Sequence, residues 1–435
     1  MWNPSAGLIA MSNIAAKLSF ILIALAVLYQ FFLAIVGLFP NRTLRRISQN
    51  RSLSAKTRFA IVIAARNEES VLAGLLTGLN KQAYPRELFD IFVIADNCTD
   101  KTAAVALSNG AQVFERFDKN KCSKGYALGW FFKRYLKESA FRHDAVVIFD
   151  ADNIVEPDFL TVMDRHYQAG TRVAVGYRDS KNPEDSSVAA ANSIFWLFQS
   201  RFMHQARTNL GLPLTSVSGT GFMFALDLIR EEGWNTHTLT EDNEFTMQVI
   251  LKGETPIFVR EARFYDEQTS ACSEMLRQRW RWSVGTAQTM RLMLPKLIKR
   301  ILKGEIKLID SLWFFLQIPV LAVISLFSFF NSLLLLPLFK QDIPDILIKA
   351  VPLLGSYLLI VAAVLLLLRL EGKKLKEYGK AALSYPFFIS LWMLLQGVAL
   401  FKKDTEWKPI CHSTAWQGQH KDRAPSSFTN LTHFH

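Results

Sequence analysis

Three long apolar runs constrain the fold of this 435-residue chain more than any other feature. They lie at residues 18–39, about 311–338 and about 346–368. Each is about as long as the roughly 20 residues that a transmembrane helix requires. Residues 59–285 contain no comparable run. We therefore expect a soluble domain flanked by membrane helices.

Basic flanks indicate how these runs cross the membrane. The segment after the first run carries Arg42, Arg45, Arg46, Arg51, Lys56 and Arg58. By the positive-inside rule, the N-terminus lies outside and the chain continues in the cytosol. The second and third runs have basic outer flanks, which predicts two spans with both ends in the cytosol.

Two further segments are expected to lie at the membrane surface. Residues 290–307 are basic and amphipathic, which is typical of an interfacial helix. The run 383–401 is short, contains Pro386 and Gln396, and is basic on both sides. This pattern favours an interfacial or re-entrant piece, followed by a cytosolic C-terminus.

Composition agrees with a membrane protein. Half of the residues are hydrophobic and the net charge is +12, which suits anionic lipid headgroups or a phosphate-bearing substrate. The cysteines (Cys98, Cys122, Cys272 and Cys411) are far apart without CxxC spacing, which argues against a disulfide framework or a zinc site.

The soluble segment alternates strand and helix patterns. Strands are predicted at 59–65, 89–96 and 144–150, and helices at about 68–80, 99–109 and 123–139. This alternation implies a mostly parallel sheet covered on both faces. Ligands of such sheets bind beyond the carboxyl ends of the strands. The polar residues at those ends are Asn67, Glu68, Asp96, Asp150 and Asp152.

The sequence "FDADN" (149–153) places Asp150 and Asp152 at the end of an apolar strand. Two carboxylates at this spacing can hold Mg²⁺ or Mn²⁺ together with substrate phosphates. The structural alternative is a helix cap with a solvated aspartate. A second functional alternative is a phosphatase with Asp150 as nucleophile, although no later Gly-Asp acidic loop follows.

Two more patterns contain candidate catalytic and binding residues. "TEDNEF" places Glu241 and Asp242 in the first turn of a helix, where acids complement the helix dipole or act as a general base. In "RQRWRW" (277–282), helical spacing puts Gln278, Arg281 and Trp282 on one face. That face suits a pyrophosphate beside a sugar ring. Arg279 is expected to point elsewhere, so that its replacement by alanine is mild.

Taken in order, these patterns resemble the membrane-embedded family 2 glycosyltransferases, which include cellulose, chitin, hyaluronan and poly-N-acetylglucosamine synthases. The matching elements are "AARNEE" (64–69), "ADNCTD" (95–100), "KGYAL" (124–128), "DAD" (150–152), "SGTGF" (218–222), "TED" (240–242) and "QRWRW" (278–282). The resemblance covers residues 58–285 and implies an α/β GT-A domain, which is Rossmann-like, on α-helical transmembrane segments.

The resemblance also implies residue roles. Asp242, with Glu241 beside it, is expected at the catalytic base position, and Asp152 and Asp150 at the metal. Nucleotide-sugar contacts are expected from Asn67, Glu68, Asp96, Lys124 and Asp150. Gln278, Arg281 and Trp282 are expected near the diphosphate and the acceptor, and Trp407 and His412 in a gating loop. Two departures from the family pattern are Asn97 in place of a second aspartate and Ile410 in place of a threonine.

The domain organisation expected from these patterns has five parts. They are an anchor with its basic flank (1–57), the GT-A domain (58–285), an interface helix (286–310), two membrane helices (311–370) and a C-terminal segment with the gating-like tail (371–435).

The expected function is an inverting hexosyltransferase that moves a sugar from a UDP-sugar to a growing polysaccharide in a β-linkage. The alternative is a single transfer to a lipid acceptor in the membrane. Mg²⁺ or Mn²⁺ is the expected cofactor. The expected partners are a UDP-sugar, a glycan or lipid-linked acceptor and membrane lipids, with no nucleic acid. The catalytic domain is expected on the cytosolic side of an inner or plasma membrane.

Overall fold

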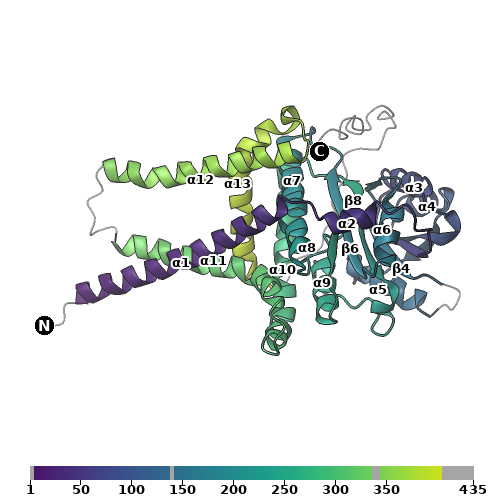
Figure 1. The fold of residues 1–435 in the computed structure, drawn as a ribbon, viewed down its shortest axis with the longest axis horizontal. Helices are drawn as coiled ribbons and strands as arrows, with labels where there is room; N and C mark the ends of the chain where they lie inside the picture. Colours follow the sequence, from purple (N-terminus) through teal and green to yellow (C-terminus); the bar gives the residue numbers. More distant parts are fainter. Residues whose placement is uncertain (1–3, 138–141, 336–342, 404–435) are drawn as a thin grey trace.

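The computed structural model describes residues 4–137, 142–335 and 343–403, and in these residues an eight-stranded sheet lies to one side of a group of long helices (Figure 1). The strands are β1 (Phe59–Ala65), β2 (Phe89–Asp96), β3 (Gln112–Arg116), β4 (Ala145–Asp150), β5 (Ile154–Val155), β6 (Val173–Ser180), β7 (Phe222–Ala225) and β8 (Ile257–Asp266). Their order across the sheet is β3-β2-β1-β4-β7-β6-β8-β5.

The sheet is mixed rather than mostly parallel as expected. Strands β1 to β4 form parallel pairs β3-β2, β2-β1 and β1-β4. Strand β7 then runs antiparallel to both of its neighbours, β4 and β6, and β5 runs antiparallel to β8. The parallel half aligns the carboxyl ends of β1, β2 and β4 along one edge. That alignment brings Asp96 and Asp150 to the same side of the sheet.

The helices that cover the sheet are α3 (Leu72–Asn80), α4 (Thr102–Ser108), α5 (Lys124–Tyr135), α6 (Phe159–Gln168), α7 (Ser187–Phe198), α8 (Ala206–Leu210) and α9 (Glu241–Leu251), with 3-10 segments η1 (Arg86–Leu88) and η3 (Leu226–Ile229) and a π-helix η2 (Gln199–Gln205). The remaining helices are α1 (Pro4–Gly37), α2 (Arg42–Ser48), α10 (Cys272–Ile301), α11 (Leu308–Leu335), α12 (Ile343–Leu370) and α13 (Leu375–Ala399).

Two hydrophobic cores lie on opposite faces of the sheet. In β1, Ala60 and Val62 pack into the core with α5 and α7, whereas Phe59, Ile61 and Ile63 pack into the core with α3 and α6. Side chains of a strand alternate between faces, so a strand buried on both faces requires an uninterrupted apolar sequence. The apolar runs 59–65 and 89–96 have this pattern, and the prediction that they form strands is confirmed.

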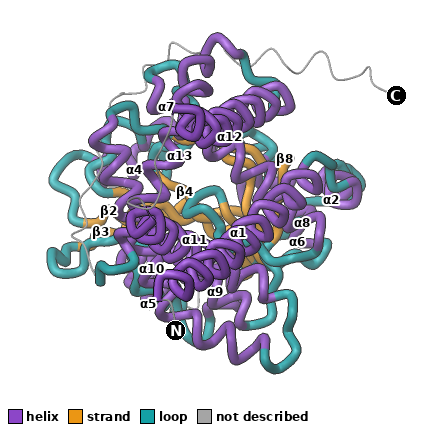
Figure 2. Tube along the Cα trace, turned by 90° about the vertical axis from the view of Figure 1, so that its left-hand side faces the viewer, coloured by secondary structure: helices purple, strands orange, loops and turns teal. Residues whose placement is uncertain are grey.

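Long helices project away from the sheet. Helices α1, α11 and α12 extend to the left of Figure 1, and the view from that side in Figure 2 shows α1 and α11 next to each other. Helix α12 packs against α13 and α7. Within the described residues, α13 alone is long and apolar enough to span a membrane, and the bent pair Ile21–Gly37 and Arg42–Ser48 would make a second span.

Two segments differ in form from the sequence-based expectation. Residues 286–301 do not form a separate interface helix, because α10 runs without a break from Cys272 to Ile301. Residues 383–399 belong to the continuous helix α13, which contains Pro386. Helix α13 contacts α7, α10, α11 and α12. It therefore joins the projecting helices to the sheet domain.

Buried ion pairs fix the long helices to the sheet domain. Asp310 of α11 accepts hydrogen bonds from Arg207 of α8, at 2.7 and 3.1 Å, and from Tyr29 of α1. Glu371, which follows α12, pairs with Arg201 and with Arg260, the latter at 2.6 Å. Pairing of this kind offsets part of the cost of burying these charges.

Candidate active site

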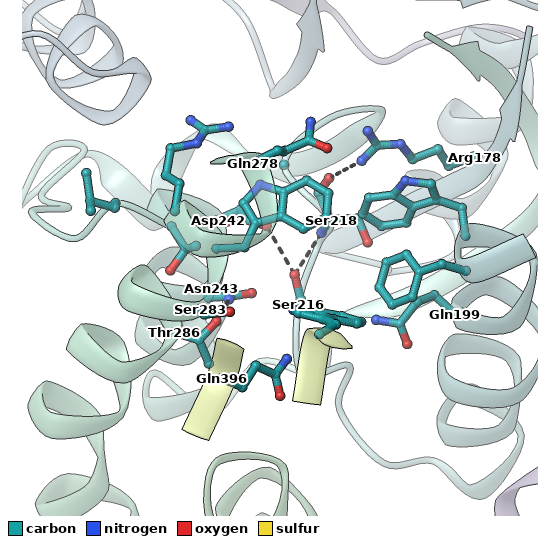
Figure 3. A pocket seen from close by; sticks show the side chains of 18 of the residues that line it. Arg178, Gln199, Ser216, Ser218, Asp242, Asn243, Gln278, Ser283, Thr286 and Gln396 are labelled. Atoms are coloured by element: carbon teal, nitrogen blue, oxygen red, sulfur yellow. Dashed lines mark hydrogen bonds between the residues drawn. The ribbon is translucent and has the colours of Figure 1, made fainter. Parts of the chain in front are cut away.

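A cavity of about 780 Å³ begins at the carboxyl edge of the sheet and continues between the long helices. Its polar end is lined by the ends of β1, β2 and β4, by the loop before β7 and by the first turn of α9. Its other end is lined by α1, α11, α12 and α13. Segments that are far apart in the sequence thus contribute to one space (Figure 3).

Lys124 connects two of the predicted site elements. Ser123 caps α5 by accepting a hydrogen bond from the Tyr126 amide, which places Lys124 in the first turn. The Lys124 ammonium pairs with Asp150 and donates to the Gly219 carbonyl oxygen at 2.7 Å. Burial acts to lower the Lys124 pKa, but the charges of Asp150 and Glu241 outweigh it and raise that pKa.

The turn at 218–221 depends on its glycines. Gly221 has a φ of +63°, and a Cβ atom there would lie 2.1 Å from the Phe264 ring. Such a contact is impossible, so a side chain at this position would displace the turn. This turn carries the Gly219 carbonyl oxygen and places Gly219 beside the Asp242 carboxylate.

Glu241 and Asp242 are buried in the first turn of α9, next to this turn. Asp242 Oδ2 accepts a hydrogen bond from the Ser216 hydroxyl at 3.1 Å, and Ser216 Oγ accepts from the Ser218 amide at 3.0 Å (Figure 3). Burial raises the pKa of Glu241 to about 7, and burial likewise raises the pKa of Asp242. Two carboxylates with raised pKa values are suited to accept a proton near neutral pH.

The helical face predicted from "RQRWRW" lines the cavity. Gln278, Arg281 and Trp282 of α10 all contribute to the lining, with an amide, a cation and an indole ring respectively. Trp282 packs edge-on against Trp196 of α7, with the ring centres 5.6 Å apart. These contacts bring α7 and α10 together at the middle of the cavity.

The expectation that Arg279 is peripheral is wrong. Its side chain is fully buried behind the cavity wall, where its Nη2 donates to Asn192 Oδ1 at 2.7 Å. The guanidinium carbon lies 4.1 Å from the centre of the Phe195 ring, 4.7 Å from Trp282, 4.3 Å from Trp392 and 5.2 Å from Phe388. Burial lowers the pKa of Arg279 to about 9. The aromatic faces of α7, α10 and α13 therefore hold this cation in place of a carboxylate.

Three of the residues predicted to contact the nucleotide differ in their position relative to the cavity. Asp96 lines the cavity, but its carboxylate is buried and paired with Arg116. Glu68 also lines the cavity. Asn67 does not line it: its side-chain oxygen accepts from the Thr99 amide at 2.8 Å and so ties two loops together. The predicted gating residues Trp407 and His412 lie outside the described residues.

Several lining residues were not predicted from the sequence. Arg178 of β6 donates to Asp266 at 2.9 Å and to the Ser218 carbonyl oxygen at 3.0 Å, and its guanidinium lies 3.7 Å from the centre of a Trp196 ring. Lys181 is not part of the lining, but it donates to the carbonyl oxygen of the lining residue Asp152 at 2.9 Å. The signal for Arg178 was its position near the end of the apolar strand "VAVGYRDS", which we did not read as a strand.

The π-helix η2 also reaches the cavity. Gln199, Met203 and His204 of this segment line it. The stretch 186–206 is rich in aromatic and small residues. Part of it is core, and the π-helical end forms cavity wall. The wider π-helical turn changes the direction of successive side chains, which is common near functional sites.

The donor set fits a divalent metal only in part. No group of three or more His, Cys, Asp and Glu side chains with metal-binding geometry occurs among the residues that the structure describes. Asp150 and Asp152 remain as two carboxylates beside open space in the cavity. This set suits Mg²⁺ or Mn²⁺ that takes its other ligands from substrate phosphates and water, and it does not suit a closed protein cage.

Comparison with known proteins identifies relatives. Residues 57–285, just over half of the chain, match the model of the family described as glycosyltransferase-like family 2. The chain is 28% identical, over 244 residues, to a beta-monoglucosyldiacylglycerol synthase of Nostoc, covering 53% of this chain and 49% of that protein. It is 24% identical to a probable glycosyltransferase of Bacillus subtilis, covering 70% of this chain and 73% of that protein. The chain thus spans about half the length of the Nostoc relative.

A solved structure supports the fold. The chain resembles a mannosyltransferase of Pyrobaculum calidifontis, crystallised with GDP-mannose and Mn²⁺, with a TM-score of 0.55 and 14% sequence identity. The similarity covers 89% of this chain and 98% of that one. At this identity the likeness establishes the GT-A fold with its mixed sheet, and it says nothing of the substrate.

Proposed function

Because the chain belongs to glycosyltransferase-like family 2, we propose that it transfers a sugar from a nucleoside-diphosphate sugar to a hydroxyl group of an acceptor that reaches the site from the membrane. The observation that carries this proposal is the continuity of the cavity. One space holds the carboxylates and cations at the sheet edge and also reaches the long apolar helices. A purely soluble acceptor would not require that extension.

The charges at the polar end suit a nucleoside diphosphate donor. Lys124 and Arg281 provide positive charge for the diphosphate, and Arg is well adapted to phosphate oxygens. Asp150 and Asp152 would hold a divalent metal that neutralises the diphosphate as it leaves. A metal is also present in the complex of the mannosyltransferase named above. The family resemblance favours UDP over other nucleotides.

The carboxylates suit the proton transfer. In the proposed reaction, Asp242 accepts the proton of the acceptor hydroxyl. The oxygen of that hydroxyl attacks the anomeric carbon of the donor sugar, and the bond from this carbon to the diphosphate breaks. The Ser216 hydroxyl orients the Asp242 carboxylate through their hydrogen bond. Glu241 and Lys124 set the local charge. A single displacement of this kind inverts the anomeric centre and gives a β-linkage from an α-donor.

Two observations favour a lipid acceptor. The cavity opens among the long helices, and the Nostoc relative is named for a glycolipid product. We therefore place single-sugar transfer to a membrane lipid ahead of polymer synthesis. The protein would act in an inner or plasma membrane with its sheet domain in the cytosol.

The test uses purified protein in lipid nanodiscs with a panel of labelled UDP- and GDP-sugars and either Mg²⁺ or Mn²⁺. We expect one UDP-sugar to transfer its label into the organic phase of a chloroform extraction. Metal chelation should abolish the transfer. The proposal fails if no nucleotide sugar is turned over with either metal. Binding of aluminium or beryllium fluoride that requires Asp150, as expected of a mimic of a phosphorylated aspartate, would instead support the phosphatase alternative.

Processive polysaccharide synthesis is the second candidate. The Gln278, Arg281 and Trp282 face lines the cavity, and this motif is shared with the synthases that the sequence resembles. Product length separates the two candidates. A labelled product retained by size exclusion would support the polymer, whereas a lipid that carries a single sugar would support the first proposal.

A further inference from the structure

The part of the cavity between the long helices contains amide groups and no charges. Its lining from α1, α11, α12 and α13 is apolar or aromatic except for glutamines, and none of these lining residues is Asp, Glu, Lys or Arg. The glutamines are Gln30 of α1, Gln317 of α11 and Gln396 of α13. Gln199 of the π-helix η2 lines the same cavity. Polar side chains among apolar helices are costly and usually serve a ligand or a pathway.

Only some of these glutamine side chains form hydrogen bonds with other protein groups. Gln30 Nε2 donates to Gln317 Oε1 at 3.2 Å. Gln199 and Gln396 make no side-chain hydrogen bond within residues 4–137, 142–335 and 343–403. In the same described ranges, the buried indole N–H of Trp392, another lining residue, has no acceptor. Unmet donors and acceptors of this kind remain available to a hydroxyl-bearing ligand.

The cations of the cavity lie at the other end. They are Arg66, which follows β1, and Lys124, Arg178 and Arg281, which are on α5, β6 and α10 near the sheet edge. His204 is the ionisable lining residue contributed by η2, and burial lowers its pKa to about 3, so it is neutral. Arg279 approaches the Trp392 ring at 4.3 Å, but its guanidinium does not line the cavity. An anionic phosphate held between the long helices would therefore be buried without a cation in direct contact.

We propose that Gln30, Gln199, Gln317 and Gln396 form a subsite for the uncharged, hydroxyl-bearing headgroup of a neutral glycerolipid. This inference rests on the proposed function and specifies its acceptor. The amides and the Trp392 N–H donate hydrogen bonds to the ester oxygens, the apolar walls contact the acyl chains, and the free glycerol hydroxyl extends toward Asp242 as the acceptor. Diacylglycerol is the probe of this class, and a polyprenyl phosphate is the charged comparison.

The first experiment compares acceptors. Nanodiscs contain equal mole fractions of diacylglycerol or of a polyprenyl phosphate, and transfer from the labelled donor is measured. We expect diacylglycerol to be the acceptor. Gln396→Leu and Gln199→Leu should each raise the acceptor KM by up to about tenfold, because each removes hydrogen bonds to a neutral group, while the donor KM stays unchanged. Gln112→Leu, at an exposed glutamine of β3, is the matched control.

A second experiment detects lipid binding at the subsite and does not depend on sugar transfer. A diacylglycerol that carries a photoreactive diazirine in its headgroup is crosslinked in nanodiscs, and the labelled peptides are identified by mass spectrometry. We expect labelling of α11 and α13 that excess diacylglycerol suppresses and polyprenyl phosphate does not. Suppression by the phosphate, or absence of this labelling, overturns the subsite. Labelling without any transfer would contradict the proposed function and leave the subsite standing.

Discussion

Glu241 and Asp242 illustrate at the scale of single residues how burial prepares a carboxylate for chemistry. Acids in the first turn of a helix usually have low pKa values, because the helix dipole favours their charge. Here burial dominates and raises both pKa values, while Lys124 opposes the increase. The acids of "TED" therefore lie in the first turn of a helix, and their raised pKa values suit the proposed role in proton transfer.

The pH dependence of activity follows from these shifts. Since Asp242 must be ionised to accept a proton, kcat/KM should rise with pH, with a midpoint above the value of about 4 that a free carboxyl group has. Lys124→Met removes a charge that favours the ionised form, so the midpoint should move to higher pH. A pH profile at saturating metal measures both. A midpoint near 4, or a shift to lower pH in Lys124→Met, would contradict the assignment.

Arg279 is the residue at which sequence reasoning failed. Helical spacing correctly placed Gln278, Arg281 and Trp282 on one face, but it could not show what covers the opposite face of α10. The partners there are Phe195 and Trp392, each more than 80 positions away in the sequence. Tertiary packing of this kind has no local signal.

Arg279→Ala should consequently be severe. The change opens a cavity and removes the cation from four aromatic rings, so we expect a loss of about 2 kcal/mol or more in the free energy of unfolding, with lower activity. Thermal unfolding and the transfer assay measure the two effects. Arg277→Ala, at an exposed position two residues earlier, is the control. Equal behaviour of the two variants would refute the packing role.

At the scale of elements, α10 and α9 form the joint that aligns the candidate base with the Gln278, Arg281 and Trp282 face. Asn243 of α9 donates to the Thr286 hydroxyl at 3.3 Å, and the Leu239 amide donates to Gln288 at 3.0 Å. Gly285 lets the helices approach, because a Cβ atom there would lie 2.7 Å from the Thr240 amide nitrogen.

Gly285→Ala tests this joint. The added methyl group must push α10 away from Thr240, and misplacement of about 1 Å near a reacting centre lowers a rate by roughly a hundredfold. We expect a large fall in kcat with a smaller change in the donor KM. Gly379→Ala in α13, where an added Cβ atom meets nothing within 4 Å, should leave both constants unchanged. Wild-type kinetics in Gly285→Ala would show that the contact is unimportant.

The elements themselves were predictable to different degrees. Strands β1, β2 and β4 were found because burial on both faces gives continuous apolar runs that end in polar residues. Strand β8 was missed, since "IFVREARFYD" contains Arg260, Glu261 and Arg263. Partly exposed strands of this kind carry charges, and their pairing partners are distant in the sequence. The half of the sheet formed by β7, β6, β8 and β5, which mixes parallel and antiparallel pairs, could therefore not be inferred.

At the scale of the whole molecule, the cavity exists only because the long helices are fixed against the sheet domain. The buried pairs at Asp310 and Glu371 provide that attachment on two sides. The apolar runs of the sequence predict the long helices as membrane spans. Sequence reasoning could not pair their end residues with Arg207 or Arg201, which lie in the sheet domain, and so could not predict the shared cavity.

Asp310→Ala should loosen this attachment. It leaves the guanidinium of Arg207 buried without its partner, which costs about 3–5 kcal/mol. We expect a lower unfolding temperature and faster proteolysis between the sheet domain and α11. Glu305→Ala, which breaks a partly exposed pair with Arg300, is the control and should change neither. Unaltered stability of Asp310→Ala would contradict the role of the pair.

The most direct test of the account separates donor binding from chemistry at Asp242. UDP binding in the presence of metal is measured by calorimetry, and single-turnover transfer of a labelled sugar to lipid is measured on the same preparations. The account predicts that Asp242→Asn binds UDP as the wild type does but loses transfer by a factor of about 100 or more. Transfer by Asp242→Asn at the wild-type rate would contradict the central claim that this carboxylate accepts the proton of the acceptor.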